Sequence, residues 1–199
     1  MADLSISSSV ATPRSGARAV LRSVALALLC GVLQWGLPQY TLGSSTLAPL
    51  SIVLGVAVAA AMSRGRWTVP AALVGVLGGS LLAGDAPTTA ASGAAIVALQ
   101  ALLAGALMRH ARDADLLQLD NAPRLQRFVL VVAPATALLG VAAGLLAQWG
   151  LDTASAVSLS RPQLAGAVGR FIADAAGIVI TAPVLLCWLA RPLAPWRLR

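Results

Sequence analysis

Six long apolar runs make up most of this chain, and arginines gather in every second connector between them. A helix of roughly 17 to 25 apolar residues is long enough to cross a lipid bilayer. The runs therefore predict six membrane-spanning helices, at 19–37, 46–62, 67–83, 90–108, 127–147 and 165–189. Membrane β-strands alternate apolar and polar residues. These runs are continuously apolar, so we expect an all-α bundle.

The composition supports the bilayer as the solvent of this protein. Hydrophobic residues make up 58% and charged residues 11% of the 199 residues. Water-soluble domains carry about 25% charged residues. A chain with so few charges has too little polar surface to cover a folded body in water.

The arginines predict how the bundle is oriented. Connectors on the cytoplasmic side of membrane proteins carry an excess of basic residues. Of the 14 basic residues, all except Arg161 and Arg170 flank the first span, lie in alternate connectors or follow the sixth span. They are Arg14, Arg18, Arg22, Arg64, Arg66, Arg109, Arg112, Arg124, Arg127, Arg191, Arg197 and Arg199. We therefore expect a multi-pass membrane protein with both chain ends in the cytoplasm.

The net charge of +7 follows from this arrangement and attracts anionic lipid headgroups. Because the arginines are split among several connectors without interleaved aromatic residues, we expect the lipid bilayer as a partner and no nucleic acid. We expect three regions: a disordered cytoplasmic tail at 1–18, the membrane domain at 19–190, and a cytoplasmic C-terminal stub at 191–199. An uncleaved first span fits better than a signal peptide, because the apolar run continues through Trp35.

Small residues recur at helical spacing and predict close helix packing. They are Ala19, Ser23, Ala27 and Gly31 in the first span, Gly140 and Gly144 in the fifth, and Ala173 and Gly177 in the sixth. Such surfaces suit packing inside the bundle, and equally docking to a partner membrane helix or to a second copy in a homodimer. Pro49, Pro134 and Pro183 are expected to bend their helices, because proline removes a backbone hydrogen bond.

The last span holds two ionisable residues. Arg170 and Asp174 are four residues apart, a spacing at which side chains meet on one helix face. A carboxylate inside the bilayer is costly unless it is paired, protonated or hydrated. Gln100 in the fourth span can add a hydrogen bond between helices. These three residues predict either a buried polar clip that fixes the packing or the polar floor of an outward-facing ligand site.

The sequence contains no catalytic or metal-binding constellation. There is no Glu and no Lys, one His at position 110, no Gly-rich phosphate loop followed by Lys, and no nucleophile elbow. We therefore expect a protein without enzymatic activity, metal or cofactor, which binds, senses, passes a solute or recruits a partner.

Four segments occur in an order that is typical of one family of membrane domains. They are Ala48-Pro49, the turn Arg64-Gly65-Arg66-Trp67 with Pro70, the stretch QALLAGALMRH at 100–110, and Asp174-Ala175-Ala176-Gly177 followed by Pro183. On these residues the chain resembles, over about residues 20–190, the membrane-associated sensor domain of the first type, the MASE family.

This resemblance implies a sensory input module of the bacterial inner (plasma) membrane. Such a module passes a signal to a cytoplasmic output domain, a histidine kinase or a cyclic-dinucleotide cyclase, or to a partner membrane protein. Two other interpretations stay open. One is the substrate-binding subunit of a transporter, similar to the small six-helix components of vitamin importers, with the ridge from Ala19 to Gly31 docking to a scaffold. The other is a purely structural assembly partner.

Overall fold

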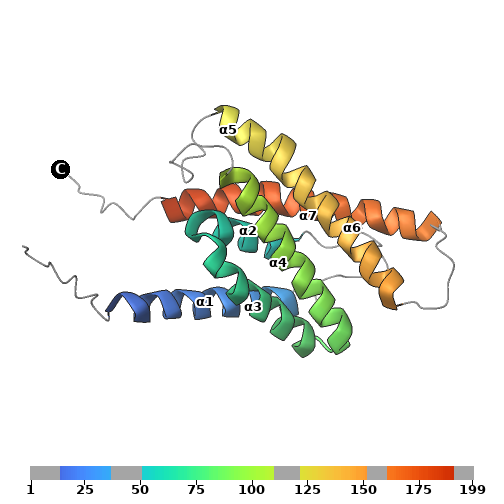
Figure 1. Ribbon diagram of the computed structural model, residues 1–199, viewed down its shortest axis with the longest axis horizontal. Helices are drawn as coiled ribbons and strands as arrows, with labels where there is room; N and C mark the ends of the chain where they lie inside the picture. The colour runs from blue at the N-terminus through green and yellow to red at the C-terminus, as the bar shows by residue number, and fades with distance from the viewer. Residues whose placement is uncertain (1–13, 37–50, 110–121, 152–160, 191–199) are drawn as a thin grey trace, which may run out of the picture.

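A computed structural model describes residues 14–36, 51–109, 122–151 and 161–190, and the structure reported below concerns these residues. They form a bundle of helices without β-strands (Figure 1). The expectation of an all-α protein is confirmed for this part of the chain.

Helices lie on all six apolar runs. They are α1 (Arg14–Gly36), α2 (Ile52–Arg64), α3 (Val69–Leu82), α4 (Pro87–Arg109), α5 (Ala122–Arg127), α6 (Ala133–Leu151) and α7 (Arg161–Ala190). A 3₁₀ turn, Arg66–Thr68, leads into α3, and a π-helical segment, Phe128–Val132, joins α5 and α6 into one rod. α7 has 30 residues and is the longest of these helices.

Within the described residues, four helical stretches are long and apolar enough to cross a membrane: Ala19–Gly36, Pro87–Arg109, Leu125–Ala147 and Gln163–Cys187. The helices over the second and third runs, Ile52–Arg64 and Arg66–Leu82, are apolar but shorter. The 13 residues of α2 rise about 20 Å, against a hydrocarbon core of roughly 30 Å. The structure thus supports a membrane protein, with four helices that reach the length of a full crossing.

Two glycines with positive φ set the ends of α2 and α3. Gly65 has a φ of +81° and Gly84 a φ of +92°, a conformation that glycine adopts without steric cost. After α3, the N–H groups of Gly84 and Asp85 donate to the carbonyls of Leu81 and Ser80, both at 3.1 Å. This hydrogen-bond pair is a Schellman motif. The chain therefore turns sharply from α3 into α4.

α2 lies at the centre of the bundle, and every residue of Val53–Met62 is buried. One side of the helix, with Leu54 and Val58, packs into a core with α4, α6 and α7. The other side, with Val56 and Ala57, packs into a second core with α1, α3 and α4. A helix that is apolar all round is stable where neighbours surround it. Because α2 is enclosed by protein, it does not need the length of a lipid-facing span.

Helix α1 begins before the first apolar run. Residues 14–18, which we expected in the N-terminal tail, are helical because α1 starts at Arg14. Arg and Ala are good helix formers, so the helix continues beyond the apolar residues. The rest of the expected tail, the C-terminal stub at 191–199 and Pro49 lie outside the described residues.

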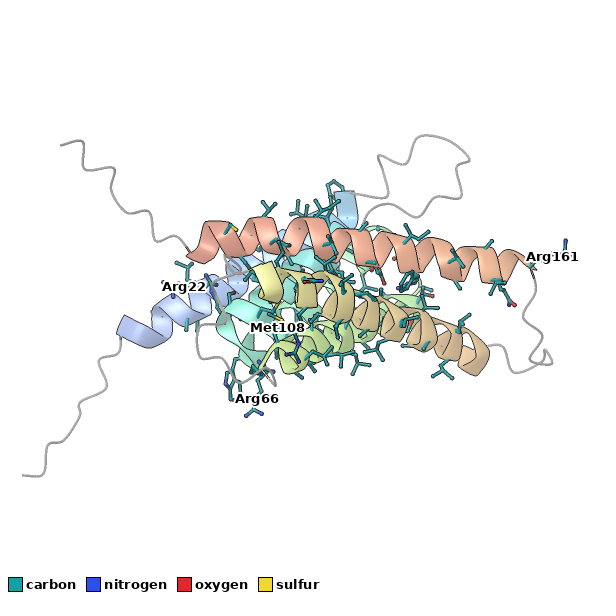
Figure 2. The ribbon with its side chains drawn as sticks, turned by 90° about the horizontal axis from the view of Figure 1, so that it is seen from above. Arg22, Arg66, Met108 and Arg161 are labelled. Carbon is teal, nitrogen blue, oxygen red and sulfur yellow. The ribbon has the colours of Figure 1, made fainter. Side chains whose placement is uncertain are left out.

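The outer faces of the bundle are apolar. Val20, Leu130 and Ile172, from three different segments, are 63%, 64% and 60% exposed. Extended exposed apolar surface marks contact with a membrane or a partner. The charges gather by contrast at the ends: Arg22, Arg66 and Met108, the neighbour of Arg109, lie toward one end of the molecule, and Arg161 lies at the opposite end (Figure 2). We call the first the basic end.

Candidate functional site

Gln100 of α4 and Asp174 of α7 meet inside the bundle. The Nε2 atom of Gln100 donates to Oδ2 of Asp174 at 3.0 Å and to the backbone carbonyl of Thr136 in α6, also at 3.0 Å. A side-chain amide nitrogen carries two hydrogens, so both are used. Gln100 is 1% exposed, Thr136 0% and Asp174 5%. These three residues, the polar cluster, connect three helices.

Gly140 brings the backbone of α6 against the polar cluster. A Cβ atom at this position would collide with Nε2 of Gln100 and would lie 2.8 Å from Oδ2 of Asp174. Folded proteins do not contain contacts this close to a Cβ, because their interiors are packed at van der Waals separation. Glycine is therefore the residue that lets α6 approach both polar side chains.

α6 approaches the polar cluster after an irregular stretch of helix. The N–H of Ala133 donates to the carbonyl of Phe128, five residues earlier. Pro134 follows and has no N–H to donate. The hydroxyl of Thr136 lies 2.8 Å from the carbonyl oxygen of Val132 and 2.9 Å from that of Ala133. Because π-helical turns inside α-helices are frequent at functional sites, this turn supports the polar cluster as a site.

α7 buries one of its sides and exposes the other. Asp174, Ile178, Ala182 and Leu186 follow one another at intervals of four residues and are 5% exposed or less. On the other side, an apolar stripe is between 52% and 60% exposed: Val168, Ile172, Ile180 and Val184. The carboxyl group thus lies on the side of α7 that packs against the bundle.

The start of α2 crosses α7 next to Asp174. The N–H of Ser51 donates to the carbonyl of Ala173 at 3.3 Å. A Cβ at Gly177 would collide with the carbonyl oxygen of Ser51, and one at Gly55 would lie 2.6 Å from the carbonyl oxygen of Gly177. Ala173 and Gly177, both expected to pack helices, therefore form a close crossing with α2 within one turn of the polar cluster.

Arg170 does not take part in the polar cluster. Its side chain is exposed, as is most of α7 between 161 and 172. In the described part of the chain no salt bridge joins Arg170 to Asp174, whose hydrogen bond comes from Gln100 instead. A neutral amide from α4 can reach the buried carboxyl group without the desolvation penalty of a buried guanidinium. The expected pairing within α7 is thus replaced by a contact between helices.

Two of the four small residues of α1 pack on α3. A Cβ at Gly75 would collide with the carbonyl oxygen of Ala27, and one at Gly79 would lie 2.5 Å from that of Gly31. Ala27 and Gly31 therefore belong to an internal interface. Nearer the start of α1, Ala19 is exposed, and the hydroxyl of Ser23 donates to the Ala19 carbonyl at 3.1 Å.

The remaining residues singled out in the sequence are not part of the polar cluster. A Cβ at Gly144 would have nothing within 4 Å, so this residue makes no close contact in the described structure. Pro183 lies inside α7, which is assigned as one α-helix from Arg161 to Ala190. No group of three or more His, Cys, Asp or Glu side chains that suits a metal ion occurs among the described residues.

Thr136 is the member of the polar cluster that sequence reasoning missed. It contributes a backbone carbonyl to Gln100, and a carbonyl leaves no mark in the sequence. A signal was nevertheless present, since a hydroxyl residue follows Pro134 within an otherwise apolar span. Proline and threonine together indicate a disturbed helix whose carbonyls become available to other donors.

Comparison of the chain with protein-family models, with curated proteins and with solved structures gave no match.

Proposed function

We propose that this chain is a multi-pass sensory module of the bacterial inner membrane that has no catalytic activity. The observation that carries the proposal is the hydrogen bond between Gln100 and Asp174, a polar contact between two helices of an otherwise apolar bundle. The resemblance of the chain to the MASE family suggests which kind of output it controls, a kinase or cyclase domain or a partner protein.

The packing of α7 supplies a route for the signal. α7 contacts α6 through the polar cluster and α2 through Gly177. Ala190 follows Asp174 by 16 residues along α7, a rise of about 24 Å toward the basic end. A stimulus shifts a protein between two arrangements only if it prefers one of them. A stimulus that strengthens or breaks the contact of Asp174 with Gln100 would favour a different position of α7.

We further propose six crossings with both chain ends in the cytoplasm. The two shorter helices are compatible with this, because α2 is surrounded by protein and α3 lies between turns at Gly65 and Gly84. Reporter domains fused after Arg64, Arg109 and Arg199 are expected to be active in the cytoplasm, and one fused after Asp85 in the periplasm. Periplasmic activity of the fusion at Arg199 would contradict this topology.

The functional test joins the chain to a kinase or cyclase output domain and measures the product. Asp174→Asn keeps an oxygen that accepts from Gln100 but removes the ionisable group, and Gln100→Leu removes the donor. Both are expected to change the output, whether basal or stimulated. Gln34→Leu is the matched control, since Gln34 donates to Ser80 at 3.2 Å in the interface of α1 and α3, away from the polar cluster. Unchanged output in both site variants would reject the proposal.

The transporter-subunit alternative depends on a small-residue ridge of α1 that is free to dock to a scaffold. Two of its four residues, Ala27 and Gly31, pack against α3 instead. The structure therefore gives this alternative less support than the sensor. A small molecule that co-purifies with the chain, or recovery of a scaffold protein with ATPase subunits, would favour it.

A further inference from the structure

The turn between α2 and α3 places three large side chains outside the bundle at its basic end. The N–H of Gly65 donates to the carbonyl of Ala61 at 3.0 Å, and the hydroxyl of Thr68 donates to the carbonyl of Gly65, also at 3.0 Å. These bonds hold a short turn in which Arg64, Arg66 and Trp67 are exposed. Trp67 is 79% exposed, the largest fraction among the large apolar side chains described.

Arg66 stacks on its neighbour Trp67. The Cζ atom of its guanidinium lies 5.5 Å from the centroid of the indole ring, within the range of a cation–π interaction. Stacking restrains the plane of the guanidinium but uses none of its five N–H groups. Within the described structure no carboxylate or carbonyl occupies these donors. Among the described residues, these donors are therefore open to an acceptor.

Arg109 reaches the same region from α4. A Cβ at Gly105 would lie 3.5 Å from both terminal nitrogens of Arg109 and 3.6 Å from the carbonyl oxygen of Ala61. The guanidinium of Arg109 is therefore near the last turn of α2, to which Arg64 belongs. Three arginines from two connectors thus lie at or near this turn.

Helix stabilisation explains only part of this arrangement. Arg64 and Arg109 each lie in the last turn of a helix, where a positive charge interacts favourably with the helix dipole. Arg66 is different, because it precedes α3, and a positive charge at a helix N-terminus is unfavourable. The dipole of α3 therefore does not explain its position, whereas a nearby negative charge would.

The described residues do not supply that charge. Their acidic side chains are Asp85, beyond the opposite end of α3, and Asp174, which is bonded to Gln100. The 14 residues of α3 rise about 21 Å, so Asp85 is remote from Arg66. An exposed tryptophan beside arginines at the end of an apolar bundle suits the headgroup layer of a bilayer. Arginine recognises phosphate through paired N–H groups.

We infer that Arg64, Arg66, Trp67 and Arg109 bind the phosphate of an anionic phospholipid in the leaflet at the basic end. The guanidinium groups of the three arginines contact the phosphate oxygens, and the indole of Trp67 lies between the headgroups beneath Arg66. This lipid site depends on insertion into a membrane but not on signalling. It can therefore hold when the sensor proposal fails.

The test uses the whole chain in an uncharged detergent, with phosphatidylglycerol as the probe and bound lipid counted by native mass spectrometry. Phosphatidylglycerol is expected to bind more tightly than phosphatidylcholine and less tightly as salt rises, because salt screens exposed charges. Arg66→Gln and Arg109→Gln are each expected to weaken binding about five-fold, since a basic residue near an anionic surface contributes to that extent. Arg66→Lys keeps the charge and loses the paired geometry, so an intermediate loss is expected.

Arg161→Gln is the matched control, because Arg161 is an exposed arginine at the opposite end (Figure 2). It changes the net charge by the same amount and is expected to leave lipid binding unchanged. Equal losses in the Arg161 and Arg66 variants would show attraction by the overall charge of +7 and would overturn the site. Inorganic phosphate that binds as tightly as phosphatidylglycerol would overturn the assignment to a lipid. Equal melting temperatures of the variants verify that each is folded.

Discussion

Gly140 of α6 lies so close to Gln100 of α4 that a Cβ at residue 140 would meet the amide nitrogen of the glutamine. The same nitrogen donates to Asp174 of α7. The missing side chain on α6 is therefore as necessary to the polar cluster as the polar side chains on α4 and α7. This relationship makes the packing of three helices depend on one buried amide.

Gly140→Ala is expected to destabilise the protein by about 1–3 kcal/mol, the usual cost of overpacking a well-packed interior. The added methyl group forces Gln100 or α6 to move. Gly144→Ala is the matched control on the same helix, because a Cβ there has nothing within 4 Å. It is expected to be neutral or stabilising by up to about 1 kcal/mol, since alanine favours helix more than glycine. Thermal unfolding in detergent measures both, and equal effects would contradict the close contact at Gly140.

Gln100→Leu is expected to cost about 1–3 kcal/mol, because it leaves the buried Asp174 carboxyl without its donor. Asp174→Leu is expected to have a cost of similar size, since one amide hydrogen of Gln100 then lacks an acceptor. The double variant should lose clearly less than the sum of the two single variants, as expected for residues in contact. A double-mutant cycle of unfolding free energies tests this, and strict additivity would show that the two side chains do not interact.

Gly75→Ala is expected to separate α1 from α3, because its Cβ would collide with the carbonyl of Ala27. The contact is with backbone, which cannot rotate away, so a loss of at least about 1 kcal/mol is expected. Gly78→Ala, on the same helix, has open space around the added methyl group. Gly75→Ala should therefore lower the free energy of unfolding by at least about 1 kcal/mol more than Gly78→Ala does. A neutral Gly75→Ala would mean that α1 does not pack there.

The two cysteines are expected to differ in their reaction with a maleimide. Cys30 is 0% exposed and Cys187 is exposed. In the native protein in detergent, only Cys187 should be labelled, because reaction requires access to the sulfur. Cys30 should become reactive at the temperature at which the bundle unfolds, with Cys30→Ala assigning the signal. Prompt labelling of Cys30 in the folded protein would contradict the packing of α1 on α3.

Much of the architecture could be predicted from the sequence, because its signals are local. Apolar runs placed the helices within a few residues, and Gly65 and Gly84 occur where the chain turns. The lengths of the helices were less predictable. Whether 13 residues suffice for α2 depends on its being enclosed by two cores, and enclosure is a property of all the neighbours together.

The candidate site was predictable in its residues but not in its partners. Polar groups inside an apolar chain are conspicuous, so Gln100 and Asp174 were identified without a structure. Spacing along one helix favoured Arg170 as the partner of Asp174, whereas the partner comes from α4, 74 residues earlier. A hydrogen bond between helices depends on how they pack, and no pattern within a single helix encodes that distance.

The sequence by itself determined a helical protein with an apolar exterior and most of its charges in or near the connectors, because the solvation of each residue depends on its own chemistry. Only the tertiary structure decided that Gly140 closes on Gln100, that Asp174 turns inward and that Arg170 stays outside. Those outcomes follow from the close packing of α4, α6 and α7, because the space between packed helices determines which side chains fit there.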